Sequence, residues 1–284
     1  MNQYVNFNGK LIPADGYSIM AGNRAYLYGD GLFESIRIMN GRIINFENHY
    51  SRLLGGIEAL KMKPPSTFSK EFFEDQIAML IAENNIQQGG WVRLSVDRKP
   101  GGKFLPESNH VDYYIEAQSI EDNKFLLNDR GWKIDLYDDI KKYISPLSRY
   151  KTKNGLIYIM AKLRSQERGL DDLLIQNYKM GIIEGGSSNL FVVSNGVLYT
   201  PGLDLGPLGG TMRMQIINIA LKNDIKVYEC NISPQNLLVA DEVFLTNAIQ
   251  GVIWVETYRT KLYGKDMART LTSYLNERWF SPQS

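Results

Sequence analysis

The sequence has very few of the residues on which disulfides and metal sites depend. Its 284 residues include one cysteine, Cys230, and two histidines, His49 and His110. A single cysteine excludes an internal disulfide and a cysteine metal cluster. Two histidines exclude a multi-histidine metal site and disfavour a histidine-rich catalytic site. We therefore expect no metal, and an enzyme of this composition would take its difficult chemistry from an organic cofactor.

The sequence also lacks strong charge and long apolar runs. Its formal net charge is +1, which gives no basic surface for nucleic acid. No apolar run approaches the length of a membrane span, and residues 1–4 do not open a signal peptide. No glycine-rich stretch matches a nucleotide-triphosphate loop or a dinucleotide fingerprint. We expect a cytoplasmic protein with neither a nucleic-acid nor a membrane partner.

Strand and helix patterns alternate along the whole chain. Asn8-Gly9, Asn40-Gly41 and Asn195-Gly196 each separate two β-rich runs and predict tight hairpins. Apolar residues at helical spacing predict helices from Phe46 to Leu60 and from Ser69 to Asn84. Further helices are predicted before Gly169, over the end of 208–223, and from Lys265. Strands are expected at 91–96, 111–117, 132–137, 173–176, 190–193, 227–232, 242–246 and 252–257.

A polar stretch without periodicity divides these elements into two groups. Residues 118–130 carry no helix or strand pattern, which is typical of a connection between domains. The sequence therefore predicts a smaller first domain, residues 1–118, a linker over 119–130, and a larger second domain, residues 131–284. The fold class is α+β.

Three segments could carry chemistry, and each has an ordinary structural alternative. In LGGTMRMQII, Gly209-Gly210-Thr211 opens a helix whose N–H groups would face an anion, although many helices simply start at glycine. In IIEGGSSNLF, Glu184 is either a solvated turn residue or a carboxylate that keeps a pyridine nitrogen protonated. Arg52 is either a surface charge or a phosphate ligand.

Six motifs together, in this order, resemble one family, the class IV pyridoxal-phosphate aminotransferases. That family includes branched-chain and D-amino acid aminotransferases and 4-amino-4-deoxychorismate lyase. YGDGLFESIR is similar to its N-terminal motif, and ENHYSRL to its helix with a phosphate-binding arginine. YKTKNGLIYIMAK resembles its catalytic segment, in which a lysine stands three residues before an asparagine. IIEGGSSNLF, GGTMR and DEVFLTNAIQGV resemble its three remaining cofactor segments.

The resemblance implies a fold, a cofactor and a set of residues. The fold is fold type IV, with a smaller N-terminal α/β domain and a larger C-terminal α/β domain containing a barrel-like sheet. Pyridoxal 5'-phosphate would form a Schiff base with Lys151 rather than Lys153, and Glu184 would hold the ring nitrogen. The resemblance also implies a homodimer. The phosphate would be bound by Arg52, Gly210, Thr211 and Met212, with help from Asn247 and Ala248.

The substrate and the reaction are left open by the sequence. Candidate substrate-binding residues are Phe33, in LFESIR, and Arg98 and Lys103, in a loop that the family folds over the substrate. The leading expectation is amino transfer between an amino acid and a 2-oxo acid. The alternative is loss of pyruvate from aminodeoxychorismate to give 4-aminobenzoate for folate synthesis. Met212 and the pair Asn247-Ala248 favour the lyase, whereas Glu34 favours the aminotransferase.

Two positions weaken particular branches of the family. The stretch 97–106, DRKPGGKFLP, lacks the Arg-x-His pair of D-amino acid aminotransferases. Gly155 stands where branched-chain members have a tyrosine after the asparagine of the lysine segment. The sequence therefore does not select the substrate or its chirality.

Overall fold

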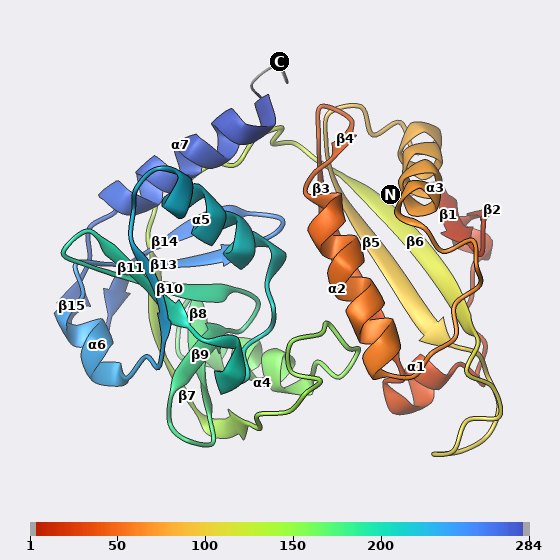
Figure 1. Cartoon of the computed structure of the whole chain (residues 1–284), viewed down its shortest axis with the longest axis horizontal. Coiled ribbons are helices and arrows are strands. Elements are labelled where there is room, and N and C mark those ends of the chain that lie inside the picture. The colour runs from red at the N-terminus through yellow and green to blue at the C-terminus, as the bar shows by residue number, and fades with distance from the viewer. Residues whose placement is uncertain (1–3, 281–284) are drawn as a thin grey trace. The chain divides into compact units, whose positions relative to one another are not determined.

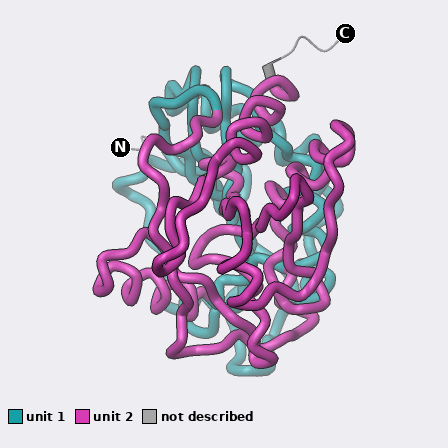
Figure 2. The backbone as a smooth tube through the Cα atoms, turned by 90° about the vertical axis from the view of Figure 1, so that its left-hand side faces the viewer, with its two compact units in different colours: residues 1–124, 150–154 teal, residues 125–149, 155–284 magenta. Residues whose placement is uncertain are grey.

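The computed structural model describes residues 4–280, which form two compact units (Figure 2). The first unit runs to Lys124 and also includes Tyr150–Asn154. The second unit comprises Phe125–Arg149 and the chain from Gly155 onward.

The first unit is built on a six-stranded antiparallel sheet with the order β2-β1-β6-β5-β3-β4 (Figure 1). The predicted turns join β1 to β2 and β3 to β4, and Asn8, Gly9, Asn40 and Gly41 all have positive φ, as this turn type requires. The strands are β1 (Tyr4–Phe7), β2 (Lys10–Pro13), β3 (Gly31–Met39), β4 (Arg42–Ile43), β5 (Gly89–Arg98) and β6 (Val111–Ile120).

One face of this sheet is covered by two helices, α2 (Phe46–Ala59) and α3 (Lys70–Glu83). Side chains alternate along each strand, so every second residue faces the helices. Leu32, Ile36 and Ile38 of β3 therefore lie in the core, whereas Phe33 and Ser35 lie on the opposite face. A short helix, α1 (Arg24–Tyr28), precedes β3, and a 3-10 turn, η1 (Ala14–Gly16), follows β2.

The second unit contains a closed ring of strands. The pairings run β10-β13-β14-β7-β8-β9, and an additional pairing of β9 with β10 closes the ring. This ring confirms the barrel-like sheet that was expected. The strands are β7 (Trp132–Lys142), β8 (Asp172–Asn177), β9 (Ile182–Gly185), β10 (Asn189–Ser194), β11 (Val197–Pro201), β12 (Val227–Cys230), β13 (Glu242–Asn247), β14 (Gly251–Tyr258) and β15 (Lys261–Leu262).

Four helices accompany this sheet, and α5 and α7 contact each other (Figure 1). The interior of the unit is apolar, with Leu190, Leu245 and Val255 among its fully buried residues. The helices are α4 (Leu156–Glu167), α5 (Thr211–Lys222), α6 (Pro234–Val239) and α7 (Asp266–Phe280), and a 3-10 turn, η2 (Leu203–Leu205), precedes α5.

The boundaries of the two units differ from the predicted domains in two ways. The lysine segment, Tyr150–Asn154, belongs to the first unit because its backbone bonds to β3. The stretch 119–130 is divided, since β6 runs to Ile120 and Phe125 is already buried in the second unit. Both differences arise from long-range contacts that local sequence patterns do not contain.

Within residues 4–280, no helix combines the length and apolarity needed to cross a membrane. In the same range, no group of three or more histidine, cysteine, aspartate or glutamate residues is arranged to hold a metal ion.

Candidate functional site

The two lysines of the lysine segment have different surroundings. The segment pairs alongside β3. The N–H of Phe33 donates to the carbonyl of Lys151 at 2.9 Å, and the N–H of Lys153 donates to the carbonyl of Gly31 at 2.9 Å. Lys153 Nζ lies 2.6 Å from Asp97 Oδ1, in an ion pair whose carboxylate is buried. Lys151 Nζ instead lies 4.4 Å from the centre of the Phe33 ring. Lys153 is therefore committed to a structural ion pair, and Lys151 is the lysine placed against an aromatic face.

Arg52, on α2, is held by a buried carboxylate of β3. Its Nε donates to Glu34 Oε1 at 2.9 Å, and its Nη2 is paired with Glu34 Oε2. His49, one turn earlier on α2, places Nδ1 2.7 Å from the same Oε2. A carboxylate can only accept, so His49 Nδ1 carries the proton of this hydrogen bond. The two contacts of Arg52 fix the plane of its guanidinium group.

The charges in this cluster are set by burial and by each other. Burial by itself would raise the pKa of Glu34, but Arg52 and the hydrogen bonds from His49 and Arg52 lower it to about 2. Burial lowers the pKa of His49, and the charges of Arg52 and Lys151 act in the same direction, although Glu34 opposes them. Glu34 is therefore ionised and His49 neutral at pH 7. Since Lys151 and Arg52 both act on His49, the structure brings these two predicted residues into one neighbourhood.

Phe33 lies between two cationic side chains that come from different segments. Besides Lys151, the guanidinium of Arg93 lies over its ring, 3.9 Å from the centre. Arg93 is on β5, opposite Ser35 of β3 and Glu116 of β6. Among residues 4–280, the guanidinium of Arg93 makes no hydrogen bond or ion pair, and its backbone is paired in the sheet. This partly buried guanidinium is a candidate carboxylate-binding group.

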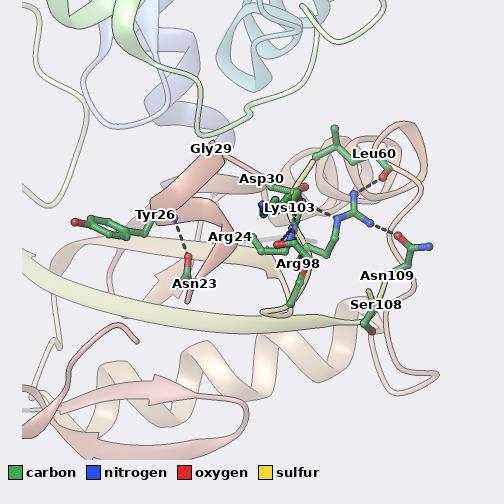
Figure 3. Close-up of polar contacts among 12 residues, drawn as sticks. Asn23, Arg24, Tyr26, Gly29, Asp30, Leu60, Arg98, Lys103, Ser108 and Asn109 are labelled. Atoms are coloured by element: carbon green, nitrogen blue, oxygen red, sulfur yellow. Dashed lines mark hydrogen bonds and ion pairs between the residues drawn. The ribbon is translucent and has the colours of Figure 1, made fainter. Parts of the chain in front are cut away.

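The side chain of Arg98 is buried and hydrogen-bonded to other residues of the first unit (Figure 3). Its Nε donates to Asp30 Oδ2 at 2.9 Å, and its other nitrogens donate to Leu60 O at 2.7 Å and Asn109 Oδ1 at 2.5 Å. It is 6% exposed. These contacts favour a role in holding the unit together, and we do not propose Arg98 as a substrate ligand.

The loop that contains Lys103 is held by Arg24. Arg24 pairs with Asp30 and donates to the carbonyls of Gly101, Gly102 and Lys103 (Figure 3). The side chain of Lys103 is exposed, and the next residue, Phe104, is 92% exposed. The structure thus fixes the backbone of this loop and leaves its side chains at the surface.

In the second unit, the carboxylate of Glu184 is buried and receives three hydrogen bonds. Lys142 Nζ donates to Oε1 at 2.6 Å, and the Tyr158 hydroxyl donates to the same oxygen at 3.0 Å. The N–H of Leu208 donates to Oε2 at 2.8 Å. Burial and the adjacent carboxylate raise the pKa of Tyr158, so its hydroxyl stays protonated and also accepts from Lys142 at 2.8 Å. Glu184 is therefore fixed in orientation rather than solvated.

The predicted phosphate-binding residues start α5. Gly210 is the N-cap residue of this helix, and Thr211 and Met212 form the first turn, both buried. A glycine N-cap has no side-chain oxygen to offer the first N–H groups of the helix. Leu208, whose N–H is bonded to Glu184, precedes Thr211 by only three residues. One short segment therefore connects the buried carboxylate to a helix N-terminus.

Asn247 is the last residue of β13, and Ala248 opens the turn that leads to β14. Asn247 Oδ1 accepts hydrogen bonds from the N–H groups of Ile249, at 3.0 Å, and Gln250, at 2.8 Å. Its side chain thus shapes the turn, and Ala248 is partly buried at the start of that turn.

Sequence motifs alone do not assign a role to several residues of these clusters, although some of them carry a signal in the sequence. In WVRLSVDR, Val92, Leu94 and Val96 alternate with polar residues, which places Arg93 on the face opposite the core. His49 precedes Arg52 by three residues and therefore shares its helix face. Lys142 and Tyr158 carry no local signal, because only the fold brings them to Glu184.

This chain is similar to enzymes of one family along most of its length. The family model for amino-transferase class IV matches residues 31–258. A putative branched-chain-amino-acid aminotransferase of Methanocaldococcus jannaschii is 26% identical over 97% of this chain and 94% of its own. A D-alanine aminotransferase of Listeria innocua is 28% identical over 84% of this chain and 82% of its own. An aminodeoxychorismate lyase of Vibrio harveyi is 22% identical over 81% of this chain and 84% of its own.

The fold has solved counterparts as well. A branched-chain aminotransferase of Thermoproteus uzoniensis, crystallised with norvaline, superposes with a TM-score of 0.88. It is 23% identical, and the match covers 96% of this chain and 93% of the other. This likeness confirms the predicted fold.

Proposed function

The chain belongs to the class IV aminotransferases, and on that premise we propose that it binds pyridoxal 5'-phosphate and transfers an amino group between an amino acid and a 2-oxo acid. The reaction would use Lys151 as the lysine that holds the cofactor covalently. Members of this family act on branched-chain amino acids, on D-amino acids or on aminodeoxychorismate, and the relatives of this chain include all three kinds.

The observation that carries this proposal is the segment from Glu184 to α5. Glu184 offers a buried, oriented carboxylate, which suits a protonated ring nitrogen. The start of α5 offers backbone N–H groups and the positive end of a helix, which suit a phosphate. A phosphorylated pyridine needs both, and the N–H of Leu208 connects one to the other. The donor set of the second unit therefore fits the cofactor.

The first unit would supply the remaining groups. Arg52, with its plane fixed by Glu34, would bind the phosphate together with Gly210, Thr211 and Met212. Asn247 and Ala248 would contribute from their turn. When bound, the cofactor supplies an electron-withdrawing ring that stabilises negative charge at the substrate's α-carbon. The amine of Lys151 would take the α-proton and return it, and Glu184 would keep the ring nitrogen protonated.

Arg93 and Phe33 are the substrate-binding residues that we propose. A carboxylate of the substrate would form hydrogen bonds with the guanidinium of Arg93, which lies 3.9 Å from the Phe33 ring centre. The ring would fix the guanidinium by cation–π contact and give an apolar wall to the substrate. Lys103, which is exposed on its loop, is a second candidate for binding the substrate carboxylate.

A second candidate function is the lyase reaction on aminodeoxychorismate. Met212 at the start of α5 and the pair Asn247-Ala248 favour it, and the Vibrio harveyi lyase is among the relatives. Glu34 favours the aminotransferase. Both reactions begin with removal of the same α-proton, so Lys151, Glu184 and Arg52 serve either one.

We further propose that the protein acts in the cytoplasm as a homodimer. Phe104 and Leu105 are 92% and 85% exposed on a loop whose backbone Arg24 holds in place. Exposed apolar side chains of this kind favour burial against another protein surface. The mass of the protein in solution, measured by light scattering, tests this: a dimer supports the proposal and a monomer contradicts it.

The visible absorption spectrum of the purified protein with added pyridoxal phosphate tests the cofactor. We expect a band of lysine-bound cofactor in the native protein and in Lys153→Gln, but not in Lys151→Gln. The glutamine at position 153 keeps a hydrogen-bond donor for Asp97. Absence of the band from the native protein would overturn the proposal. A band lost in Lys153→Gln but kept in Lys151→Gln would reverse the assignment of the lysine.

Two assays then separate the reactions. Release of 2-oxo acids from L-leucine, L-valine, D-alanine and L-glutamate, each with a 2-oxo acid acceptor, would identify an aminotransferase and its substrate. Formation of 4-aminobenzoate and pyruvate from aminodeoxychorismate, without any amino transfer, would identify the lyase.

A further inference from the structure

Asn189 stands where three segments of the second unit meet. It is the first residue of β10 and is paired with Glu184 of β9 in the antiparallel ladder. Its side-chain amide is buried and donates to both oxygens of Thr246, at 2.8 Å to the carbonyl and 3.0 Å to Oγ1. Asn189 therefore connects the strand end beside Glu184 with the C-terminal end of β13.

The same amide lies directly against the start of α5. A Cβ added to Gly210 would lie 1.9 Å from Asn189 Oδ1 and 2.7 Å from its Nδ2. Real Cβ atoms do not approach other heavy atoms this closely. Gly210 is therefore required by the position of Asn189, and the amide forms the wall against which the helix start rests.

The segment between these contacts is short and doubly fixed. This segment is Leu208–Gly210. The N–H of Leu208 donates to Glu184 Oε2 at 2.8 Å, and Gly210 lies against the side-chain amide of Asn189. Glu184 and Asn189 are themselves opposite each other in the β9–β10 ladder. The geometry that relates the carboxylate to the helix start is thus set by one pair of residues.

We propose that Asn189 is a positioning residue that sets the phosphate-binding start of α5 relative to Glu184. This inference rests on the proposed binding of pyridoxal phosphate. The nitrogen of that cofactor lies in a rigid pyridine ring, and a short methylene link joins the phosphate to the same ring, so the two groups keep a nearly fixed separation. Both are bound well only when their partners are correctly spaced. Asn189 acts through Gly210 and Thr246 and sets that spacing without contacting the cofactor.

The test compares two ligands that differ only in the phosphate. Equilibrium dissociation constants for pyridoxal phosphate and for pyridoxal are measured in the native protein and in Asn189→Ala, an uncharged change. Loss of a buried hydrogen-bonding group is expected to weaken pyridoxal phosphate binding by about tenfold or more. Binding of pyridoxal, which lacks the phosphate, is expected to change by less than about threefold, the scale of small packing changes.

A double-mutant cycle with Gly210→Ala gives a second readout. Alone, Gly210→Ala drives its methyl group into the Asn189 amide and should weaken pyridoxal phosphate binding. Combined with Asn189→Ala, the methyl group has room, so the double variant should bind better than the sum of the two losses predicts. Strict additivity would contradict the proposal.

The remaining outcomes are also distinguishable. Equal weakening for pyridoxal and pyridoxal phosphate would mean that Asn189 only supports the fold, which overturns the proposal. If Asn189→Ala does not fold, Thr246→Val replaces it, because this change removes the Oγ1 contact and keeps the carbonyl contact. Unchanged pyridoxal phosphate binding in the Asn189 variant, or in Thr246→Val when it replaces that variant, would likewise overturn it. A native protein that binds no pyridoxal phosphate would instead overturn the proposed function.

Discussion

At the scale of single residues, the Glu34–Arg52 pair shows how a buried charge is kept in place. An unpaired arginine among apolar residues would be costly, and Glu34 compensates its charge. His49 then satisfies the same carboxylate without adding charge, because burial lowers its pKa. A neutral cluster of this kind holds Arg52 ready for a phosphate and keeps it from turning toward solvent.

The lowered pKa of Glu34 gives a prediction for acid stability. Because this pKa falls from 4.5 to about 2 on folding, the ionised carboxylate stabilises the protein above pH 4.5. The stabilisation is lost as the pH falls from 4.5 through 2. Glu34→Gln should lower the free energy of unfolding at pH 7 by roughly 3 kcal/mol. Urea unfolding at a series of pH values should show the native and variant curves converging below pH 4.5. A gap that does not change with pH would contradict this assignment.

Arg93 gives a prediction about the substrate. Arg93→Ala should raise KM for amino acids and 2-oxo acids by about tenfold or more, since a charge-assisted hydrogen bond contributes roughly 1.5–3 kcal/mol. The affinity for pyridoxal phosphate should stay the same, because Arg93 is not among the proposed cofactor ligands. Steady-state kinetics and cofactor titration measure the two effects separately. Arg130→Ala, which removes a largely exposed arginine paired with Asp171, is the matched control. A loss of cofactor affinity with unchanged KM would assign Arg93 to the cofactor.

At the scale of elements, the position of Lys151 depends on strand pairing. The lysine segment pairs with β3 through two backbone hydrogen bonds, and Gly31 lies where the lysine segment and β3 approach each other. A Cβ at Gly31 would lie 2.5 Å from Asp97 Oδ1 and 3.1 Å from Lys153 Cδ. The Lys153–Asp97 ion pair occupies the space that a side chain at Gly31 would need.

We therefore expect Gly31→Ala to displace the lysine segment. The change should lower the free energy of unfolding by about 1–3 kcal/mol, the usual cost of overpacking. It should also weaken pyridoxal phosphate binding, since Lys151 would move. Gly16→Ala is the control, because a Cβ there meets no atom within 4 Å. Thermal unfolding and cofactor titration check both effects, and equal behaviour of the two variants would refute the expectation.

Elements also show what a sequence can and cannot predict. The three Asn-Gly hairpins and the helices α2 and α3 follow from local residue patterns, and the structure contains them all. Strand β9, at Ile182–Gly185, has only four residues, too few for a periodic pattern. The attachment of Tyr150–Asn154 to β3 joins residues more than a hundred positions apart, which no local pattern encodes.

The residues of the candidate site also differ in whether local sequence patterns predict them. Motifs, each a short run of neighbouring residues, predict the roles of Lys151, Glu184, Arg52 and the start of α5. Lys142 and Tyr158 reach Glu184 from β7 and α4, and nothing in their own segments marks them. Arg98 was proposed from its place in a polar loop, but its partners Asp30 and Leu60 come from elsewhere in the unit.

At the scale of the whole molecule, the proposed cofactor ligands come from both units. Lys151 and Arg52 belong to the first unit, and Glu184 and the start of α5 belong to the second. A ligand that binds only the folded state stabilises every part of the protein that its binding requires. Pyridoxal phosphate should therefore stabilise both units, even though each has its own hydrophobic core.

Calorimetry with and without the cofactor tests this. At a concentration about a hundredfold above Kd, binding should add roughly 2.7 kcal/mol and raise Tm by about 5–10 °C. Lys151→Gln, which cannot hold the cofactor covalently, should show a clearly smaller rise at the same concentration. Resolved transitions for the two units should both move upward with cofactor, because each unit contributes ligands. A rise confined to one transition would show that a single unit binds the cofactor, and the residues assigned from the other unit would then have to be withdrawn.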